Sequence, residues 1–239
     1  MSIRRTRGCL NPQSCGFIAA VFAAILMVWS VLWLRFLWAL TWLAAVVGLW
    51  MLTRHWNRKK PIPFPYAFRW FLRLPRPSQS RDLIRILQPR RGERVLEIGP
   101  GLGTHALSVA SGLSPGGFLD VVDVQHIMVR TVVRHAREQG ITNVNGCTAD
   151  AARLPYLDQA FDGAYLITVL GEIPDRDAAL RELFRILKRS GRLVVGELLV
   201  DPDFVSSRHL QGQAERAGFV FHSKTGGPAA YLARFERIG

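Results

Sequence analysis

The stretch "VLEIGPGLG", Val95–Gly103, decides the fold of this chain. Val95, Leu96 and Ile98 are typical of a buried strand, and glycines at alternate positions then end it. In a doubly wound sheet, a glycine-rich turn after the first strand forms the floor of the ligand crevice. Glu97 adds a carboxylate at the end of the strand, where it suits a ligand with an ammonium group better than a pyrophosphate.

The sequence around this turn alternates between strand and helix patterns. This alternation predicts an α/β domain with a doubly wound, mainly parallel sheet. The predicted strands are 95–98, 118–122, 144–148, 161–168, 193–200, 219–223 and 230–235, and the predicted helices are 78–88, 104–111, 125–140, 175–191 and 206–217.

Three further features lie where strands of this sheet end. Asp123 follows the second strand, 24 positions after Gly99, and can accept hydrogen bonds from two ribose hydroxyls. Asp150, in "TADA", follows the third strand and can bind an adenine amino group. The fourth strand runs out through "FDGAYLITVLGEIPD", 161–175, across the crevice from the glycine turn. Together with the turn, these features describe a ligand with adenine, ribose and a charged amino-acid tail, which is S-adenosylmethionine.

The same motifs resemble the class I S-adenosylmethionine-dependent methyltransferases, in the branch that contains the ubiquinone/menaquinone-biosynthesis and small-molecule enzymes. The matching pieces are "VLEIGPGLGT", "VVDV", "TADAARLPYLDQAFDGAYLITVLGEIPD", "ALRELFRILKRSGRLVVGE" and "AERAGFVFHSKTGGPAAYLARFER". The resemblance implies a Rossmann-like sheet of seven strands, with the last strand antiparallel. The cofactor-binding candidates are Glu97, Gly99, Gly101, Gly103, Asp123, Val124, Asp150, Ala151 and Thr168.

The catalytic candidates are weaker. Methyl transfer needs a base only if the acceptor atom loses a proton, and Glu172 and His126 are the two candidates for that role. The family often has histidine where this chain has Gly171 and Glu172, and Ser190 replaces a usual glycine. His105 also falls near the predicted pocket, although an isolated histidine is more often structural.

The charge of the chain is concentrated at its N-terminal side. Residues 1–95 carry 16 Lys/Arg and two Asp/Glu, whereas the rest carry 15 and 16. A nearly neutral folded domain argues against nucleic acid as a partner, and arginines around apolar sequence favour a membrane surface. The three cysteines suggest no disulfide framework, and the six histidines show no metal-ligand spacing, so we expect no protein-bound metal.

An apolar run, 17–52, contains Arg35 as its only charge and has cationic residues on both flanks. A helical hairpin of two membrane spans is slightly favoured over one long tilted helix, although "WLRFLW" contains no turn-forming residue. A cleaved secretory signal is disfavoured because the run is too long and lacks a cleavage site. The segment 61–77, with Phe64, Tyr66, Phe68, Trp70 and Phe71, resembles a membrane-interface region.

The predicted organisation is a basic cytoplasmic N-terminus (1–16), membrane segment or segments (17–52), an interfacial linker (53–77) and a methyltransferase domain (78–239). We expect an enzyme anchored in the cytoplasmic membrane, with its domain facing the cytoplasm, that methylates a lipid-like acceptor such as a quinone or a phospholipid head group. The alternatives are a methyltransferase for a soluble metabolite and a tethered protein that binds the cofactor without turnover. A Rossmann dehydrogenase is disfavoured by Glu97, by Thr104 and by the fourth-strand motif. The oligomeric state stays open.

Overall fold

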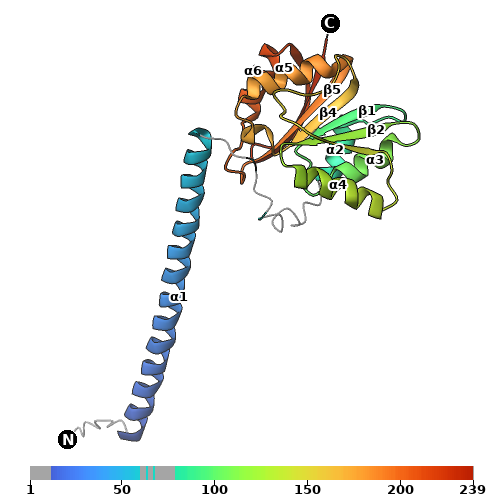
Figure 1. Cartoon of the computed structure of the whole chain (residues 1–239). Coiled ribbons are helices and arrows are strands. Elements are labelled where there is room, and N and C mark those ends of the chain that lie inside the picture. Colours follow the sequence, from blue (N-terminus) through green and yellow to red (C-terminus); the bar gives the residue numbers. More distant parts are fainter. Residues whose placement is uncertain (1–11, 60–62, 64–66, 68–78, 239) are drawn as a thin grey trace, which may run out of the picture. The chain divides into compact units, whose positions relative to one another are not determined.

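A computed structural model describes residues 12–59, 63, 67 and 79–238 of the chain. It divides into two compact units, Met1–Leu52 and Thr53–Gly239 (Figure 1). The interfacial aromatic segment predicted from Phe64 to Phe71 lies outside the described residues, apart from Ala67.

Helix α1, Pro12–Lys59, is one uninterrupted helix of 48 residues. The preference for a hairpin is therefore wrong, because "WLRFLW" offers no glycine or proline to break the backbone hydrogen bonds. Its section Leu26–Trp56 is long and apolar enough to cross a membrane by length and composition, and its large apolar side chains are exposed.

The second unit is an α/β domain built on a seven-stranded sheet in the order β3-β2-β1-β4-β5-β7-β6. Strands β1 to β5 are parallel where they pair, and β7 is antiparallel to both β5 and β6. The strands are β1 (Arg94–Ile98), β2 (Phe118–Asp123), β3 (Val144–Thr148), β4 (Phe161–Ile167), β5 (Leu187–Leu198), β6 (Phe219–Gly226) and β7 (Ala230–Arg237). The prediction of a doubly wound sheet with an antiparallel last strand is confirmed.

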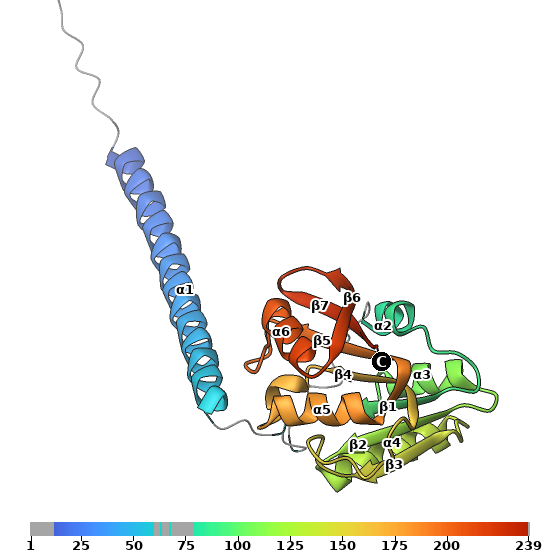
Figure 2. The same ribbon diagram turned by 90° about the horizontal axis from the view of Figure 1, so that it is seen from above.

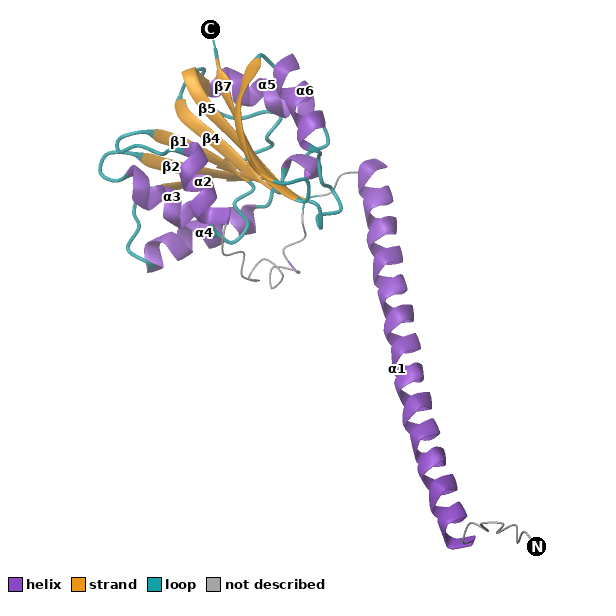
Figure 3. Ribbon diagram, turned by 180° about the vertical axis from the view of Figure 1, so that it is seen from behind, coloured by secondary structure: helices purple, strands orange, loops and turns teal. Residues whose placement is uncertain are grey.

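Helices cover both faces of this sheet (Figure 3). One face carries α2 (Gln79–Leu87), α3 (Ala106–Leu113) and α4 (His126–Glu138), and the other carries α5 (Arg176–Ile186) and α6 (Ser207–Arg216). Figure 2 shows the same domain from above. Strand residues alternate between the two apolar cores: Val95 of β1 packs with the α2–α4 core, and Leu96 packs with the α5–α6 core.

Among the helix boundaries of the α/β domain, the end of α5 differs most from the prediction. The helix expected to continue to Gly191 ends at Ile186, and β5 begins at Leu187, which pairs with Phe161. The Arg237 guanidinium from β7 donates to the carbonyls of Phe184 (2.9 Å) and Arg185 (3.1 Å). A cation that satisfies the last carbonyls of a helix stabilises its end, so Arg237, which is 52 positions after Arg185, fixes this boundary.

Helix α2 is held on the sheet in a similar way by two buried arginines. Arg234 of β7 donates to the Ile86 carbonyl (3.2 Å), and Arg192 of β5 donates to the Gln88 carbonyl (3.0 Å). Arg192 also pairs with Glu93, just before β1, and both side chains are largely buried. These arginines join the start of the domain to its late strands.

We predict that Arg192→Met destabilises the domain by about 3 kcal/mol, because it leaves the buried Glu93 carboxylate without its charged partner. The apparent Tm of the full chain in detergent should fall by roughly 6–12 °C in scanning calorimetry. The control is Arg189→Met on the same strand, where the side chain is exposed. Equal melting of the two variants would rule out the role given to this pair.

Candidate functional site

The candidate site lies where the strand order reverses, between β1 and β4. Connections leave these two neighbouring strands in opposite directions, and open α/β sheets bind their ligands at the carboxyl ends of the strands at such a point. Because β2, β1 and β4 are parallel and in register, Asp123, Ile98 and Ile167 end at the same edge of the sheet.

The glycine turn after β1 has a packing role as well as a conformational one. Gly99 and Gly103 both have positive φ angles, 65° and 86°. A Cβ on Gly99 would overlap the side chain of Val169, and a Cβ on Gly103 would lie 3.2 Å from Val132 of α4. The bare backbone at Gly99 therefore lets the segment after β4 approach the turn after β1.

Glu97 is the buried acid of this turn. Its side chain is 3% exposed and lies in register with Tyr165 of β4. Its Oε2 atom has no hydrogen-bond partner among the described residues. Burial raises the pKa of Glu97 to about 8, and the neighbouring Tyr165 phenol offsets part of that rise. A buried polar atom without a partner is rare in folded proteins, which favours a ligand group here.

The two other predicted acids lie at the ends of the next strands. Asp123, the last residue of β2, is half-buried, and its Oδ1 accepts the Gln125 N–H at 2.8 Å. Burial raises the pKa of Asp123. The Asp123 carbonyl accepts the Ala149 N–H at 3.2 Å, so the segments after β2 and β3 are hydrogen-bonded at this edge.

The segment after β3 is a turn with one buried and one exposed candidate. Asp150 is exposed, and its Oδ1 accepts the Ala152 N–H at 2.9 Å. This local hydrogen bond is typical of an aspartate that stabilises a turn. Ala151 is buried beside it, and Val124, after β2, is 49% exposed. An apolar residue therefore follows each of the two acids directly in the chain.

Thr168 follows β4 instead of ending it, and it has a φ of 55°. A β-branched residue rarely adopts this left-handed conformation, and such strain is concentrated at functional sites. Its N–H donates to the Gly196 carbonyl of β5 at 2.7 Å. This bend directs Val169 over Gly99 and starts the short 3-10 helix η2, Leu170–Glu172.

The two candidate bases lie on different halves of this edge. His126 begins α4, and its Nδ1 lies 3.1 Å from the Thr148 hydroxyl at the end of β3. Glu172 ends η2, after β4. The sheet order places β1 between these two positions, so the structure does not bring them together. His105 is buried, with its Nδ1 2.9 Å from the Ser80 hydroxyl, consistent with a structural role.

The departure from the family pattern at Gly171 has a structural reason. A Cβ on Gly171 would overlap the backbone carbonyl of Asp203, which belongs to the loop after β5. With a larger residue at position 171, η2 could not lie this close to that loop. The contact joins η2 to the β5–α6 loop, defined as residues 199–206.

Sequence reasoning missed a second buried acid, Glu197 near the end of β5. It is 2% exposed, and its Oε1 atom has no hydrogen-bond partner among the described residues. Burial raises the pKa of Glu197 to about 9, and the nearby Asp201 carboxylate adds to the rise. The signal was present in "VVGELLV", because an acid inside an apolar strand pattern must lie against one of the two cores.

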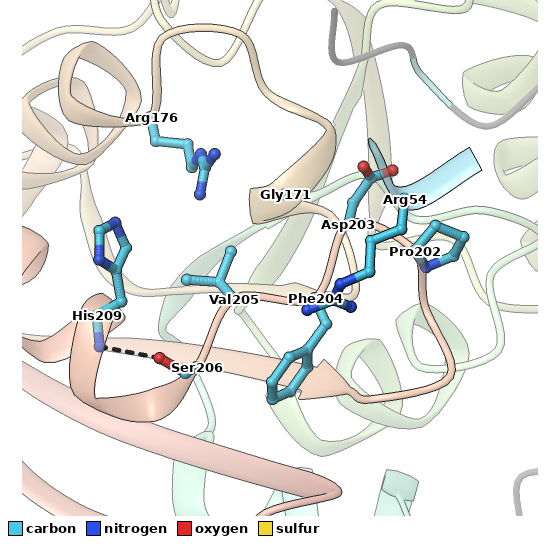
Figure 4. Close-up of a pocket in the computed structure, with 9 residues that line it drawn as sticks. All are labelled: Arg54, Gly171, Arg176, Pro202, Asp203, Phe204, Val205, Ser206 and His209. Atoms are coloured by element: carbon cyan, nitrogen blue, oxygen red, sulfur yellow. Dashed lines mark hydrogen bonds between the residues drawn. The ribbon is translucent and has the colours of Figure 1, made fainter. Parts of the chain in front are cut away.

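A hollow opens beyond η2 and the β5–α6 loop (Figure 4). We call it the η2–α6 hollow. The residues of the α/β domain that line it are Gly171, Arg176, Pro202, Asp203, Phe204, Val205, Ser206 and His209. All of them follow β4 or β5, whereas Glu97, Asp123 and Asp150 belong to β1, β2 and the segment after β3. The reversal point therefore separates two groups of candidate residues.

The α/β domain has the fold of known methyltransferases. A structure described as a SAM-dependent methyltransferase from Aquifex aeolicus has a TM-score of 0.67 at 17% identity, over 73% of this chain and all of that one. The [4+2]-cyclase SpnF has a TM-score of 0.61 at 21% identity, over 68% of this chain and 81% of that one. These identities establish the fold alone, and the predicted fold class is confirmed.

Sequence relatives narrow the fold to a family. UbiE of Pasteurella multocida (strain Pm70), a ubiquinone/menaquinone biosynthesis C-methyltransferase, is 34% identical over 117 residues, which cover 47% of this chain. The chain spans 44% of that relative's length, less than half. The sequence profile of the ubiE/COQ5 methyltransferase family matches residues 78–202, just over half of the chain. The predicted resemblance is confirmed: this chain belongs to the ubiE/COQ5 methyltransferase family.

Proposed function

We propose that the protein is an S-adenosylmethionine-dependent methyltransferase that acts on a lipid-like acceptor at a membrane. The observation that carries the proposal is the buried carboxylate of Glu97 beside the glycine turn, whose Oε2 atom has no hydrogen-bond partner among the described residues, in a chain of a methyltransferase family. A cationic amino-acid tail is the kind of ligand group that would give this carboxylate a partner.

The candidate residues fit the cofactor part by part. Glu97 and the turn of Gly99, Gly101 and Gly103 would hold the amino-acid end. Asp123 would bind the ribose hydroxyls through the carboxylate oxygen that Gln125 leaves open. Asp150 would bind the adenine amino group.

Apolar and strained residues complete the proposed cofactor site. Val124 and Ala151 would pack against the adenine ring, since they are the apolar residues that directly follow Asp123 and Asp150. Thr168 would lie near the reacting end, because it directs the chain from β4 across the glycine turn.

The cofactor supplies an activated methyl group, so the residues of the chain have to position the acceptor and exclude water. The η2–α6 hollow follows β4 and β5, on the side of the sheet edge opposite the proposed ribose and adenine sites. We therefore assign the acceptor to this half. Glu172, at the end of η2, is better placed than His126 to take a proton from it.

Two features favour a lipid-like acceptor. The relative from Pasteurella multocida is described as acting in ubiquinone and menaquinone biosynthesis, and such quinones carry long apolar tails. Helix α1 has the length and composition of a membrane span, with Arg54 and Arg58 close to its C-terminal end. A cytoplasmic domain tethered by α1 would meet its acceptor at the membrane surface.

A protein that binds the cofactor without methyl transfer is the second candidate. It is favoured by the likeness to SpnF, described as a [4+2]-cyclase, since the fold is not restricted to one reaction. Binding of S-adenosylhomocysteine without turnover on quinols, phospholipids or soluble metabolites would favour it.

We predict that Asp123→Ala weakens S-adenosylhomocysteine binding by about 100-fold, because two charge-assisted hydrogen bonds to the ribose would be lost. Calorimetry of the full chain in detergent would measure this, with nicotinamide cofactors as negative ligands. Asp158→Ala is the control, since that exposed aspartate pairs with Arg185 and lies before the start of β4, away from the carboxyl ends of the strands. Unchanged affinity of Asp123→Ala would refute the assignment of this site.

We also predict that cofactor binding releases a proton from Glu97. Because the pKa of free Glu97 is about 8, the group is largely neutral at pH 7. A bound ammonium group favours the carboxylate, lowers this pKa and expels the proton. Calorimetry at pH 7 in buffers of different ionisation enthalpy should detect the release, which should disappear at pH 9 and in Glu97→Gln. An identical proton count in the wild type and in Glu97→Gln would contradict this role.

For the acceptor, we predict that the full chain in nanodiscs methylates a short-chain naphthohydroquinone with a free ring carbon. Labelled cofactor would report the product. The full chain should also stay with membranes after an alkaline carbonate wash, because the section Leu26–Trp56 of α1 is long and apolar enough to cross a membrane. Turnover of a water-soluble metabolite with none of the quinol would favour the soluble-acceptor alternative.

A further inference from the structure

Two buried side chains lie opposite each other where β5 and β7 approach the η2–α6 hollow. Glu197 of β5 is in antiparallel register with Tyr231 of β7, so both side chains lie on the same face of the sheet. Glu197 is 2% exposed and Tyr231 is 4% exposed. Neither residue has a part in the proposed cofactor site.

Both side chains bind the backbone of one loop residue, Val205. The Val205 N–H donates to Oε2 of Glu197 at 3.4 Å, and the Tyr231 hydroxyl donates to the Val205 carbonyl at 2.7 Å. The ring of Tyr231 also packs edge-on against Phe204, with 6.1 Å between the ring centroids. We call Glu197 and Tyr231 the loop clamp.

The clamped residues form part of the wall of the hollow. Phe204 and Val205 both line it, and the next residue, Ser206, caps α6 by accepting the His209 N–H (Figure 4). Gly171 of η2 packs directly on Asp203 of the same loop. Movement of Val205 would therefore disturb the wall of the hollow and its junction with η2.

We propose that Glu197 and Tyr231 are positioning residues that hold the β5–α6 loop in the conformation that binds the methyl acceptor. This inference rests on the proposed function, because the acceptor is assigned to the η2–α6 hollow. It predicts that the clamp controls binding of the acceptor and leaves binding of the cofactor unchanged.

The charges around Glu197 give the clamp a dependence on pH. Asp201 and Glu172 face it from the β5–α6 loop and η2, Arg176 opposes them from α5, and Tyr231 faces it from β7. In the closed loop Glu197 keeps its proton up to a pKa of about 9, against an ordinary value of 4.5. Between these two values, opening of the loop exposes and ionises the group, so the closed loop loses stability as the pH rises.

The first test compares three variants of the full chain in nanodiscs with the short-chain naphthohydroquinone. Tyr231→Phe keeps the ring on Phe204 but removes the donor to Val205, and Glu197→Ala removes the acceptor. Each should raise the KM for the quinol by about five- to tenfold, while the Kd for S-adenosylhomocysteine stays within about twofold. Glu197→Gln keeps an oxygen that accepts the Val205 N–H and should restore the wild-type KM. Glu138→Gln, which changes an exposed side chain at the end of α4, is the control.

The second test measures hydrogen exchange of the Val205 amide without any acceptor. After correction for the intrinsic rate, opening in the wild type should increase by up to about tenfold per pH unit between pH 6 and 8, because one proton is lost on opening. In Glu197→Gln the corrected opening of Val205 should not depend on pH, since the glutamine side chain does not ionise in this range.

The outcomes separate the clamp from the proposed function. Unchanged quinol KM in Tyr231→Phe and Glu197→Ala, or an equal rise in the Kd for S-adenosylhomocysteine, would overturn the clamp. If the wild type does not methylate the quinol, the acceptor proposal fails, and the exchange experiment still decides the clamp. The same pH dependence of Val205 exchange in the wild type and in Glu197→Gln would refute it.

Discussion

The close approach of Val169 to Gly99 is the constraint on which the rest of the site depends. It requires a glycine after β1 and a left-handed Thr168 after β4, and both occur at neighbouring strand ends. With any side chain at position 99, the segment after β4 could not pass over the turn. The contact joins the turn after β1 to the segment after β4, on either side of the point where the strand order reverses.

The two buried acids of this domain have different surroundings and serve different proposals. Glu97 packs beside Tyr165 on the face covered by α2, α3 and α4, and its Oε2 atom has no hydrogen-bond partner among the described residues. Glu197 lies on the opposite face, holds a loop amide and has two other acids nearby. Burial raises the pKa of both, but only Glu97 lies next to the glycine turn.

Side chains of β5 and β7 stabilise the domain and also position the elements around its candidate site. Arginines of β5 and β7 bind the ends of helices that lie earlier in the sequence. Arg234 and Arg192 bind the end of α2, and Arg237 binds the end of α5. Each arginine satisfies carbonyls that the helix leaves open. The β7 strand therefore connects the two helical layers, and through Tyr231 it also contacts the loop that lines the η2–α6 hollow.

The sequence alone determined that the sheet is doubly wound and mainly parallel, because this depends on the local periodicity of strands and helices. It also determined the glycine turn and the acids at the ends of β1 and β2, because the carboxyl ends of parallel strands share one edge of the sheet. The long apolar run was also visible in the sequence. That run forms one continuous helix, because "WLRFLW" contains no residue that breaks a helix, even though its length had favoured two spans. Tertiary structure decided the end of α5, the exclusion of a side chain at Gly171, and the pairing of Glu197 with Tyr231. Each of these is a contact between residues far apart in the chain, and local patterns carry no information about which distant backbone will occupy a given space.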